Sequence, residues 1–395
     1  MKVKDKIFNI LRENTMLIVL VLVVLFFNFS TNGTMLLPSQ FNALITQNAY
    51  VYVLATGMLM CMLTGGNIDL SVGSFVCFVG VVGAKMIVHG GLPTGVGMLL
   101  MLLIGVVYGA VLGYVIAYLN VPPWIATLAG FLALRGWGVA LMNGASNVSP
   151  LPASFCDPFT GKVNDLLGGP VIGGVQYNMT SIVVGIIISV LVVLALFRGR
   201  ATKIKKGYEA DSLVAVIVKS VLICFVVMLF AYKFSLAGGI PYSLIWVAII
   251  VLIYSFITSK TDIGRYFYTI GGNAEATRLS GIDTKRIMFL AYLNMAVLTV
   301  VAAFLTMSRF KAANSTAGTN YEMDAISACI VGGVSAYGGS GTIFGMIVGA
   351  TLIGVINLGM SLMGIDANWQ KVVKGVVLLG AVVFEILNNR KKATK

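Results

Sequence analysis

Long apolar runs separated by short polar loops make up most of this sequence. Runs of about 17–25 apolar residues have the length of helices that cross a bilayer, and the chain holds about twelve of them. The expected spans are 16–31, 43–63, 68–88, 94–119, 122–142, 179–198, 213–235, 241–258, 288–308, 323–338, 342–363 and 369–388. We therefore expect an all-α polytopic membrane protein with a single transmembrane domain over residues 1–395.

The composition excludes most other classes of protein. Of 395 residues, 58% are hydrophobic and 10% are charged, which fits neither a soluble enzyme nor a disordered chain. The net charge of +13 would suggest a nucleic acid partner. However, the basic residues gather in segments at 2–12, 198–206, 260–286 and 390–395, and basic loops mark the cytoplasmic side of membrane proteins. We expect membrane lipid, and no nucleic acid, around this chain.

Alternation of the spans assigns each loop to one side of the membrane. Starting from a cytoplasmic N-terminus, alternation puts all four basic clusters and both termini in the cytoplasm. The basic loop 199–212 and the polar loop 259–287 are then cytoplasmic, and the loop 142–178 lies outside. Because this outer loop is long for a connection, it could dock an external partner; a plain connection is the other interpretation.

The chemistry-bearing residue types are sparse. The chain has one histidine and five cysteines without a C-x-x-C pair, and it lacks a phosphate-binding GxxxxGK[ST] loop. No Ser/His/Asp set and no pair of catalytic carboxylates is visible either. We expect no catalytic residue, no metal and no cofactor in this chain, so any use of ATP requires another subunit.

Glycine spacing indicates close helix packing and a repeat. Glycines at every fourth residue in 105–113 and again in 341–349 line one helix face, where a neighbouring backbone can approach. Two further segments, 65–74 and 332–340, share a Gly-Gly pair followed by Gly-Ser. Transporters carry such interrupted helices at matching places of inverted repeats.

Charged residues inside spans are costly and mark function when no simpler explanation exists. Lys85, Lys219 and Lys374 lie within reach of span ends, so their side chains can extend to the interface. Asp69 has no such route. With Asn67 and Ser71 it can cap a helix that restarts after Gly65 and Gly66; a direct role in gating or substrate passage is the alternative.

Polar and aromatic side chains in the early spans could line a hydrophilic path. Gln47 and Asn48 lie beside Tyr50 and Tyr52, and Arg135 lies near Trp137. Planar hydrogen-bonding groups and aromatic rings hold sugars, whereas Trp and Tyr also anchor helices at membrane interfaces. Both interpretations stay open for these residues.

The loop 259–287 is predicted to contain a short helix over 274–280. Asn273 can cap it, Glu275 favours its positive end, and Gly281 can end it. Ala276 and Leu279 share a face of this helix, and Arg278 projects elsewhere. Such a helix could be a rigid lever for a cytoplasmic partner or a plain amphipathic connection.

Four segments together resemble one family of membrane proteins. They are TGGNIDLSVGS (64–74), GRYFYTIGGNAEATRLSGI (264–282), TAGTNYEMDAISACIVGGVSAYGGSGTIFGMIVGA (316–350) and the basic tail after the last span. They are similar to the permease of bacterial monosaccharide ABC importers, the ribose, xylose and galactose type within the branched-chain permease superfamily. Ribose-type members have ten spans, and the two extra helices around 198–235 resemble the xylose or multiple-sugar branch.

The resemblance implies an inner-membrane permease that carries a pentose or hexose. It implies a homodimeric or pseudo-dimeric permease pair, cytoplasmic ATPase subunits that bind ATP and Mg²⁺, and an external sugar-binding protein. By it, the coupling helix that contacts the ATPase comprises Asn273, Glu275, Ala276, Arg278, Leu279 and Gly281. Residues expected along the path or at a gate are Gln47, Asn48, Asn67, Asp69, Ser71 and Arg135.

Two other functions remain as alternatives. An ion-coupled secondary transporter or channel would use Asp69 and Arg135 as coupling groups, but it leaves the capped loop helix and the outer loop without a task. A membrane transferase would need a carboxylate or histidine cluster, which the sequence lacks.

Overall fold

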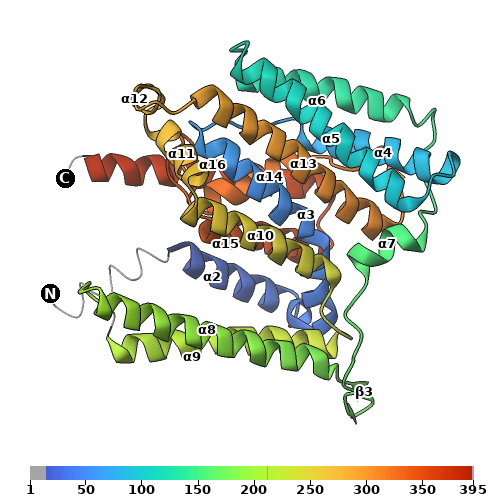
Figure 1. Ribbon diagram of the computed structural model, residues 1–395. Helices are drawn as coiled ribbons and strands as arrows, with labels where there is room; N and C mark the ends of the chain where they lie inside the picture. The colour runs from blue at the N-terminus through green and yellow to red at the C-terminus, as the bar shows by residue number, and fades with distance from the viewer. Residues whose placement is uncertain (1–14, 211, 394–395) are drawn as a thin grey trace.

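The computed structural model describes residues 15–210 and 212–393, and helices make up most of them (Figure 1). The long helices are α2 (Thr15–Ser30), α3 (Pro38–Leu63), α4 (Val72–Ala84), α5 (Thr94–Ala117), α6 (Pro123–Ala140), α8 (Met179–Lys205), α9 (Leu213–Leu236), α10 (Tyr242–Lys260), α13 (Thr284–Phe310), α15 (Ile343–Leu362) and α16 (Ala367–Ala393). Shorter helices are η1 (Thr34–Leu36), η2 (Lys85–His89), α7 (Ala153–Thr160), α11 (Asp262–Gly272), α12 (Ala274–Leu279) and α14 (Tyr321–Val331). The strands are β1 (Asn147–Val148), β2 (Val171–Ile172), β3 (Val175–Gln176) and β4 (Ala313–Asn314).

The all-α polytopic architecture is confirmed, and a helix occupies each expected span. Within the described residues, eight helices are long and apolar enough to cross a membrane. The expected span 323–338 differs most: α14 has 11 residues, about 16 Å of helix against a hydrocarbon core of about 30 Å. Gly333, Gly338 and Gly339 have positive φ angles, and they turn the rest of this apolar stretch into a loop.

The centre of the bundle is α3, and 83% of its apolar window is buried. Helices α13, α14 and α15 pack around it, and α5 packs on the far side of α13. The glycine ladder of α5 makes the last contact possible. A Cβ atom at Gly109 would lie 2.9 Å from the Cα atom of Leu293, so the ladder faces α13 as its spacing predicts.

The second ladder joins α15 to α14. A Cβ atom at Gly349 would lie 2.0 Å from the carbonyl oxygen of Ala328, and one at Gly345 would lie 2.2 Å from that of Gly332. Backbone therefore rests on backbone along this contact. The short helix α14 is fixed in the bundle by its neighbour rather than by its own length.

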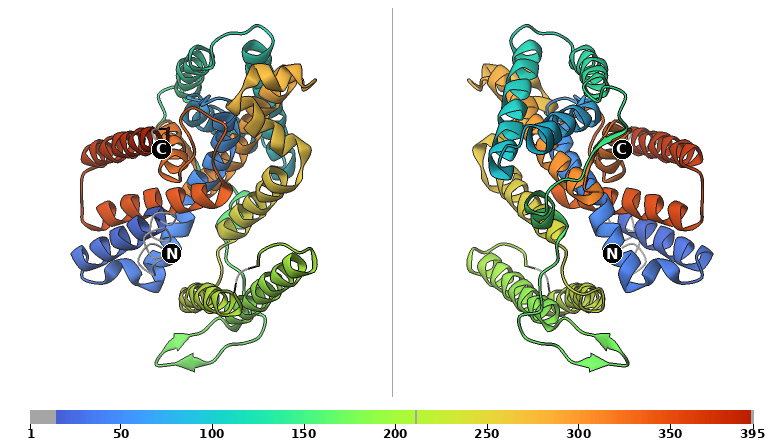
Figure 2. Two further views of the ribbon diagram at one scale, coloured as in Figure 1. Left: turned by 90° about the vertical axis from the view of Figure 1, so that its left-hand side faces the viewer. Right: turned by 90° about the vertical axis from the view of Figure 1, so that its right-hand side faces the viewer.

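Helices α8 and α9 form a hairpin at the side of the bundle (Figure 2). Only 11% of the apolar window of α9 is buried, and aromatic contacts of Phe230 and Phe234 with Phe41 join it to α3. The expected loop 199–212 is shorter than predicted. Arg and Lys are good helix formers, and α8 continues through them to Lys205.

The two ends of the bundle differ. Figure 1 shows α12, the loop between α8 and α9, and the C-terminal end of α16 at one end, which we call the α12 end. Helix α7 and the β2–β3 pair lie at the opposite end, the α7 end. The described basic segments thus share the α12 end; the predicted cluster at 2–12 lies outside the described residues.

The segment 142–178 covers the α7 end. Its helix α7 buries Phe155 and Phe159, and the hydroxyl of Ser308 in α13 donates a hydrogen bond to the carbonyl oxygen of Phe155 (3.3 Å). Strand β1 pairs antiparallel with β4, with Asn147 opposite Asn314. This segment is therefore joined to the connection between α13 and α14.

Candidate translocation and coupling sites

Helix α14 is a half-helix that begins inside the bundle. The chain leaves α13 at the α7 end and runs inward through Gly318, which lies against Gly73 at the start of α4: a Cβ atom at Gly318 would be 1.9 Å from the Gly73 carbonyl oxygen. Arg135 of α6 donates through Nη1 to the carbonyl oxygens of Ser315 (3.2 Å) and Ala317 (2.8 Å). These bonds satisfy backbone groups that a helix would otherwise pair. Such interrupted helices line the substrate sites of many transporters.

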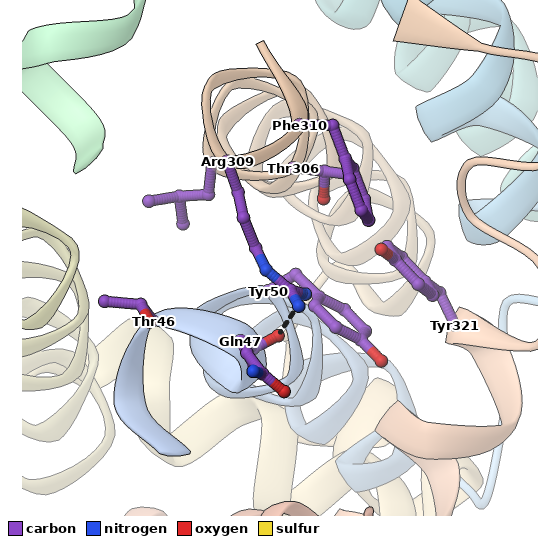
Figure 3. Close-up of a pocket in the computed structure, with 8 residues that line it drawn as sticks. Thr46, Gln47, Tyr50, Thr306, Arg309, Phe310 and Tyr321 are labelled. Atoms are coloured by element: carbon purple, nitrogen blue, oxygen red, sulfur yellow. Dashed lines mark hydrogen bonds between the residues drawn. The ribbon is translucent and has the colours of Figure 1, made fainter. Parts of the chain in front are cut away.

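A pocket lies between α3, α13 and the start of α14 (Figure 3). Its lining residues are Thr46, Gln47, Tyr50, Leu305, Thr306, Arg309, Phe310 and Tyr321. It encloses about 190 Å³, open mouth included, which is less than the roughly 300–1,000 Å³ of dedicated ligand sites. Aromatic faces, an amide and a guanidinium therefore surround a space suited to brief contact with a small polar solute.

Two tyrosines form one wall of this pocket. The rings of Tyr50 and Tyr321 stack with centroids 3.6 Å apart and planes 14° apart, and Figure 3 shows Arg309 reaching past Tyr50 to the Gln47 carbonyl oxygen. The hydroxyl of Tyr50 donates to Asp324 Oδ2 (2.7 Å). On the other side of that carboxylate, Lys374 Nζ lies 2.8 Å from Oδ1.

The Lys374 contact corrects the expectation that this side chain extends to the interface. Lys374 lies two turns into α16, and its side chain is 20% exposed. It turns inward because Asp324, 3% exposed, needs a cation there. The aspartate is in the first turn of α14 together with Glu322, where acidic side chains also favour the helix dipole.

Asp69 makes the turn that starts α4. Its Oδ1 atom accepts hydrogen bonds from the backbone N–H (2.8 Å) and the hydroxyl (2.6 Å) of Ser71, the residue that precedes the helix. Asn67 donates to the Thr64 carbonyl oxygen (3.1 Å) in the same loop. The Asp69 side chain is 1% exposed and fixes the turn before α4, but Ser71, at the N-cap position, makes no side-chain hydrogen bond to the helix, so the predicted cap is not formed as such.

Replacing Asp69 by alanine should lower the stability of the protein. The backbone N–H and hydroxyl of Ser71 lose their buried acceptor, which costs about 2 kcal/mol. The control is Asp69→Asn, whose amide oxygen can still accept both bonds. Thermal unfolding in detergent measures the difference; equal midpoints for the two variants would contradict the role of Asp69 in fixing this turn.

The two glycine-rich segments of the predicted repeat meet at the α12 end. The backbone N–H of Gly339 donates to the Leu63 carbonyl oxygen (3.1 Å), and a Cβ atom at Gly66 would lie 2.0 Å from the Ala336 carbonyl oxygen. Gly271 of α11 completes the contact, because a Cβ atom there would lie 2.0 Å from the Leu63 oxygen and 2.3 Å from the Gly339 nitrogen. Both interrupted helices therefore touch α11.

Helix α11 was missed in the sequence. The expectation covered only 274–280, yet Asp262–Gly272 is helical, with Phe267 and Ile270 buried on one face. The hydroxyl of Thr261 caps it by accepting from the Gly264 N–H (3.1 Å). That cap and the apolar pair three residues apart are readable signals of a short amphipathic helix.

Helix α12 confirms the predicted capped helix. Asn273 Oδ1 accepts from the Ala276 N–H (2.9 Å), and Gly281, with φ of 85°, follows the last turn. Arg278 Nη2 lies 2.6 Å from Glu275 Oε1, and its hydrogen bonds lower the pKa of the Glu275 carboxyl. Leu279 is 75% exposed, so an apolar side chain and an ion pair project from the α12 end.

The predicted path residues fall into three places. Gln47 lines the pocket, whereas Asn48 faces α15 and donates to the Leu44 carbonyl oxygen (2.8 Å). Asn67, Asp69 and Ser71 build the loop between α3 and α4, and Arg135 holds the segment before α14. Arg309, Tyr321 and Asp324 were not singled out from the sequence, although charges within or beside a span are the signal that could have found two of them.

Comparison with known proteins agrees with this architecture. Residues 40–382 match the family described as "Branched-chain amino acid transport system / permease component". The xylose transport system permease protein XylH of Haemophilus influenzae is 33% identical over 376 residues, covering 95% of this chain and 96% of the relative. The ribose import permease protein RbsC of Escherichia coli is 29% identical over 97% of this chain and 95% of its own length.

A third relative extends the range of named solutes. The galactose/methyl galactoside import permease protein MglC of Haemophilus influenzae is 28% identical over 98% of both chains. No solved structure matches. The family match and the 33% identity, both over most of the chain, show that this protein belongs to the branched-chain transport permease family: it is a multi-pass transport permease and not an enzyme.

Proposed function

We propose that this permease imports a monosaccharide, a pentose or hexose, across a bacterial inner membrane as part of an ABC transporter. An external sugar-binding protein delivers the sugar, and separate cytoplasmic ATPase subunits, which bind ATP and Mg²⁺, drive its passage through a pair of permease copies. The relatives named for xylose, ribose and galactose support this class of solute.

The α11–α12 unit is the observation that carries the proposal. Asn273, Glu275, Ala276, Arg278, Leu279 and Gly281 form its exposed tip, and Gly271 joins its base directly to the loops of both interrupted helices. A force applied at Leu279 is thus transmitted through backbone contacts to α3 and to the loop before α15. This is the arrangement that a separate ATPase needs in order to move the pathway.

In this proposal the α12 end faces the cytoplasm and the α7 end faces outward. The basic segments at the α12 end support the orientation, with both chain termini on that side. The segment 142–178 then docks the binding protein, and the sugar enters past Gln47 in the pocket. Asp69, Ser71 and Arg135 hold the interrupted helices between which the gate opens; Asn48 lies on α3, and Asn67 lies in the loop that follows it.

The contacts of Asp69 and Arg135 favour this proposal over ion-coupled transport. The Asp69 Oδ1 atom is occupied by Ser71, and Arg135 donates to two carbonyl oxygens of its own chain. A coupling ion would have to displace these bonds at every cycle.

Reconstituted uptake tests the proposal. The permease is placed in liposomes with its partner ATPase, and radiolabelled xylose, ribose or galactose is presented with its binding protein. We expect uptake only when the ATPase and internal ATP are both present. Uptake by the permease alone, driven by a proton or sodium gradient, would refute the importer.

A further inference from the structure

A line of three polar side chains, one buried and two half-buried, connects the outer pocket to the last helix. Tyr50 of α3 donates to Asp324 of α14 (2.7 Å), and Asp324 pairs with Lys374 of α16 (2.8 Å). The aspartate and lysine side chains are only 3% and 20% exposed. Each residue comes from a different helix, so the three side chains together connect the pocket to the edge of the bundle.

Stability alone does not account for a buried ion pair at this place. Removing two charges from water costs about as much as their attraction returns, and apolar residues of similar volume stabilise as well. Helix α14 is already held by backbone contacts between Gly349 and Ala328. The charges therefore have another task, which is the usual meaning of ionisable side chains inside a membrane protein.

The contacts show that the Asp324–Lys374 pair holds the side chain of Tyr50. The Tyr50 ring stacks on Tyr321, and its hydroxyl is bound by Asp324, one turn further along the same helix α14. Two contacts to one rigid helix fix both the plane and the direction of the Tyr50 side chain. Because Lys374 holds the other carboxylate oxygen, Asp324 cannot rotate away from that hydroxyl without leaving its cation.

We propose that Asp324 and Lys374 are positioning residues for sugar entry: they fix the Tyr50–Tyr321 stack as the aromatic wall of the pocket. The inference rests on the proposed function, in which the sugar passes this pocket. A pyranose or furanose ring meets a preformed aromatic face there, with Arg309 and Gln47 beside it. The pair acts through Tyr50 and does not touch the sugar.

The test uses the complete transporter in proteoliposomes, with the permease, its ATPase and the sugar-loaded binding protein. The variants are Tyr50→Phe, Asp324→Asn, their combination, Lys374→Met and Lys374→Arg. The matched control is Lys371→Met, one turn earlier on α16 and exposed. Uptake is measured as sugar imported per ATP hydrolysed, beside the thermal midpoint of each variant.

We expect Tyr50→Phe and Asp324→Asn each to lower the sugar imported per ATP by about tenfold. The double variant should be no worse than either single one, because both substitutions break the same link. Lys374→Met should show the same loss, and Lys374→Arg should retain transport because the cation remains. Lys371→Met should match the unmodified protein.

Two results would overturn the positioning role. One is additive loss in the double variant, accompanied by a parallel fall in thermal midpoint; the other is transport by Asp324→Asn and Tyr50→Phe equal to that of Lys371→Met. If Asp324→Asn fails to accumulate in membranes, the other two variants still test the positioning role. Tyr50→Phe keeps the aromatic ring and removes only the hydroxyl, and Lys374→Arg keeps the positive charge. Gln47→Trp separates the two proposals, because the larger side chain fills the pocket. Normal uptake by this variant would show that the sugar does not pass the pocket; it would overturn the positioning role and leave the importer proposal standing. Blocked uptake would support the pocket as part of the route.

Discussion

Replacing Leu279 by aspartate should uncouple ATP hydrolysis from sugar uptake. Leu279 is 75% exposed on α12, so its substitution should change stability by less than about 0.5 kcal/mol. In the proposed transporter Leu279 is the apolar contact to the ATPase, and a carboxylate at that place would have no partner. We expect uptake to fall at least about tenfold, as at the centre of a protein interface, with normal membrane insertion. Copurification of the ATPase and sugar-stimulated ATP hydrolysis measure the effect.

The control for this result is Leu213→Asp, at the start of α9. Leu213 is 48% exposed and is the first residue of α9, which follows the loop at the α12 end, so the variant receives the same change of charge. Reversing Arg278 to glutamate should act in the same direction as Leu279→Asp, because it places two carboxylates side by side where Glu275 and Arg278 now pair. An ATPase that binds and responds normally to both α12 variants would argue against the coupling role.

Replacing Gly271 by alanine should be strongly destabilising. The new methyl group would lie 2.0 Å from the Leu63 carbonyl oxygen and 2.3 Å from the Gly339 nitrogen. Neither backbone atom can rotate aside, so α11 must shift away from both loops. We expect a loss of about 3 kcal/mol and impaired transport, because the lever then no longer contacts the pathway helices. Thermal unfolding in detergent, with uptake measured in parallel, checks both effects.

The neighbouring residue supplies a matched control. A Cβ atom at Gly272 would meet nothing within 4 Å, so Gly272→Ala should leave stability unchanged or raise it slightly through better helix propensity. Similar midpoints for the two variants would mean that α11 does not rest on the interrupted helices.

Local chemistry made the cap of α12 predictable from sequence. Asn273 and Gly281 act through neighbouring backbone groups, so a residue pattern is sufficient to place them. The glycine ladder at 105–113 was predictable for the same reason, since spacing alone defines a helix face. In each case the prediction requires no knowledge of a distant partner.

The extent of α14 and the pairing of Asp324 depend on distant residues. The stretch after Val331 is as apolar as a span, and only contacts with Leu63, Gly65 and Gly271 show why the chain turns there. Likewise Lys374 is 50 residues from Asp324, and a lysine near a span end has an equally good local explanation. Partners brought together by tertiary packing cannot be read from spacing in one chain.

The two-residue ladder between β1 and β4 has a mechanical consequence. Because Asn147 and Val148 are paired with Asn314 and Ala313, a protein that grips the outer segment also grips the strand that descends to the half-helix α14. A movement of segment 142–178 must therefore either move the Tyr50–Tyr321 stack as well or break the pairing of β1 with β4. In the proposed transporter, docking of the loaded binding protein on segment 142–178 would thus change the middle of the bundle before the ATPase acts at the opposite end.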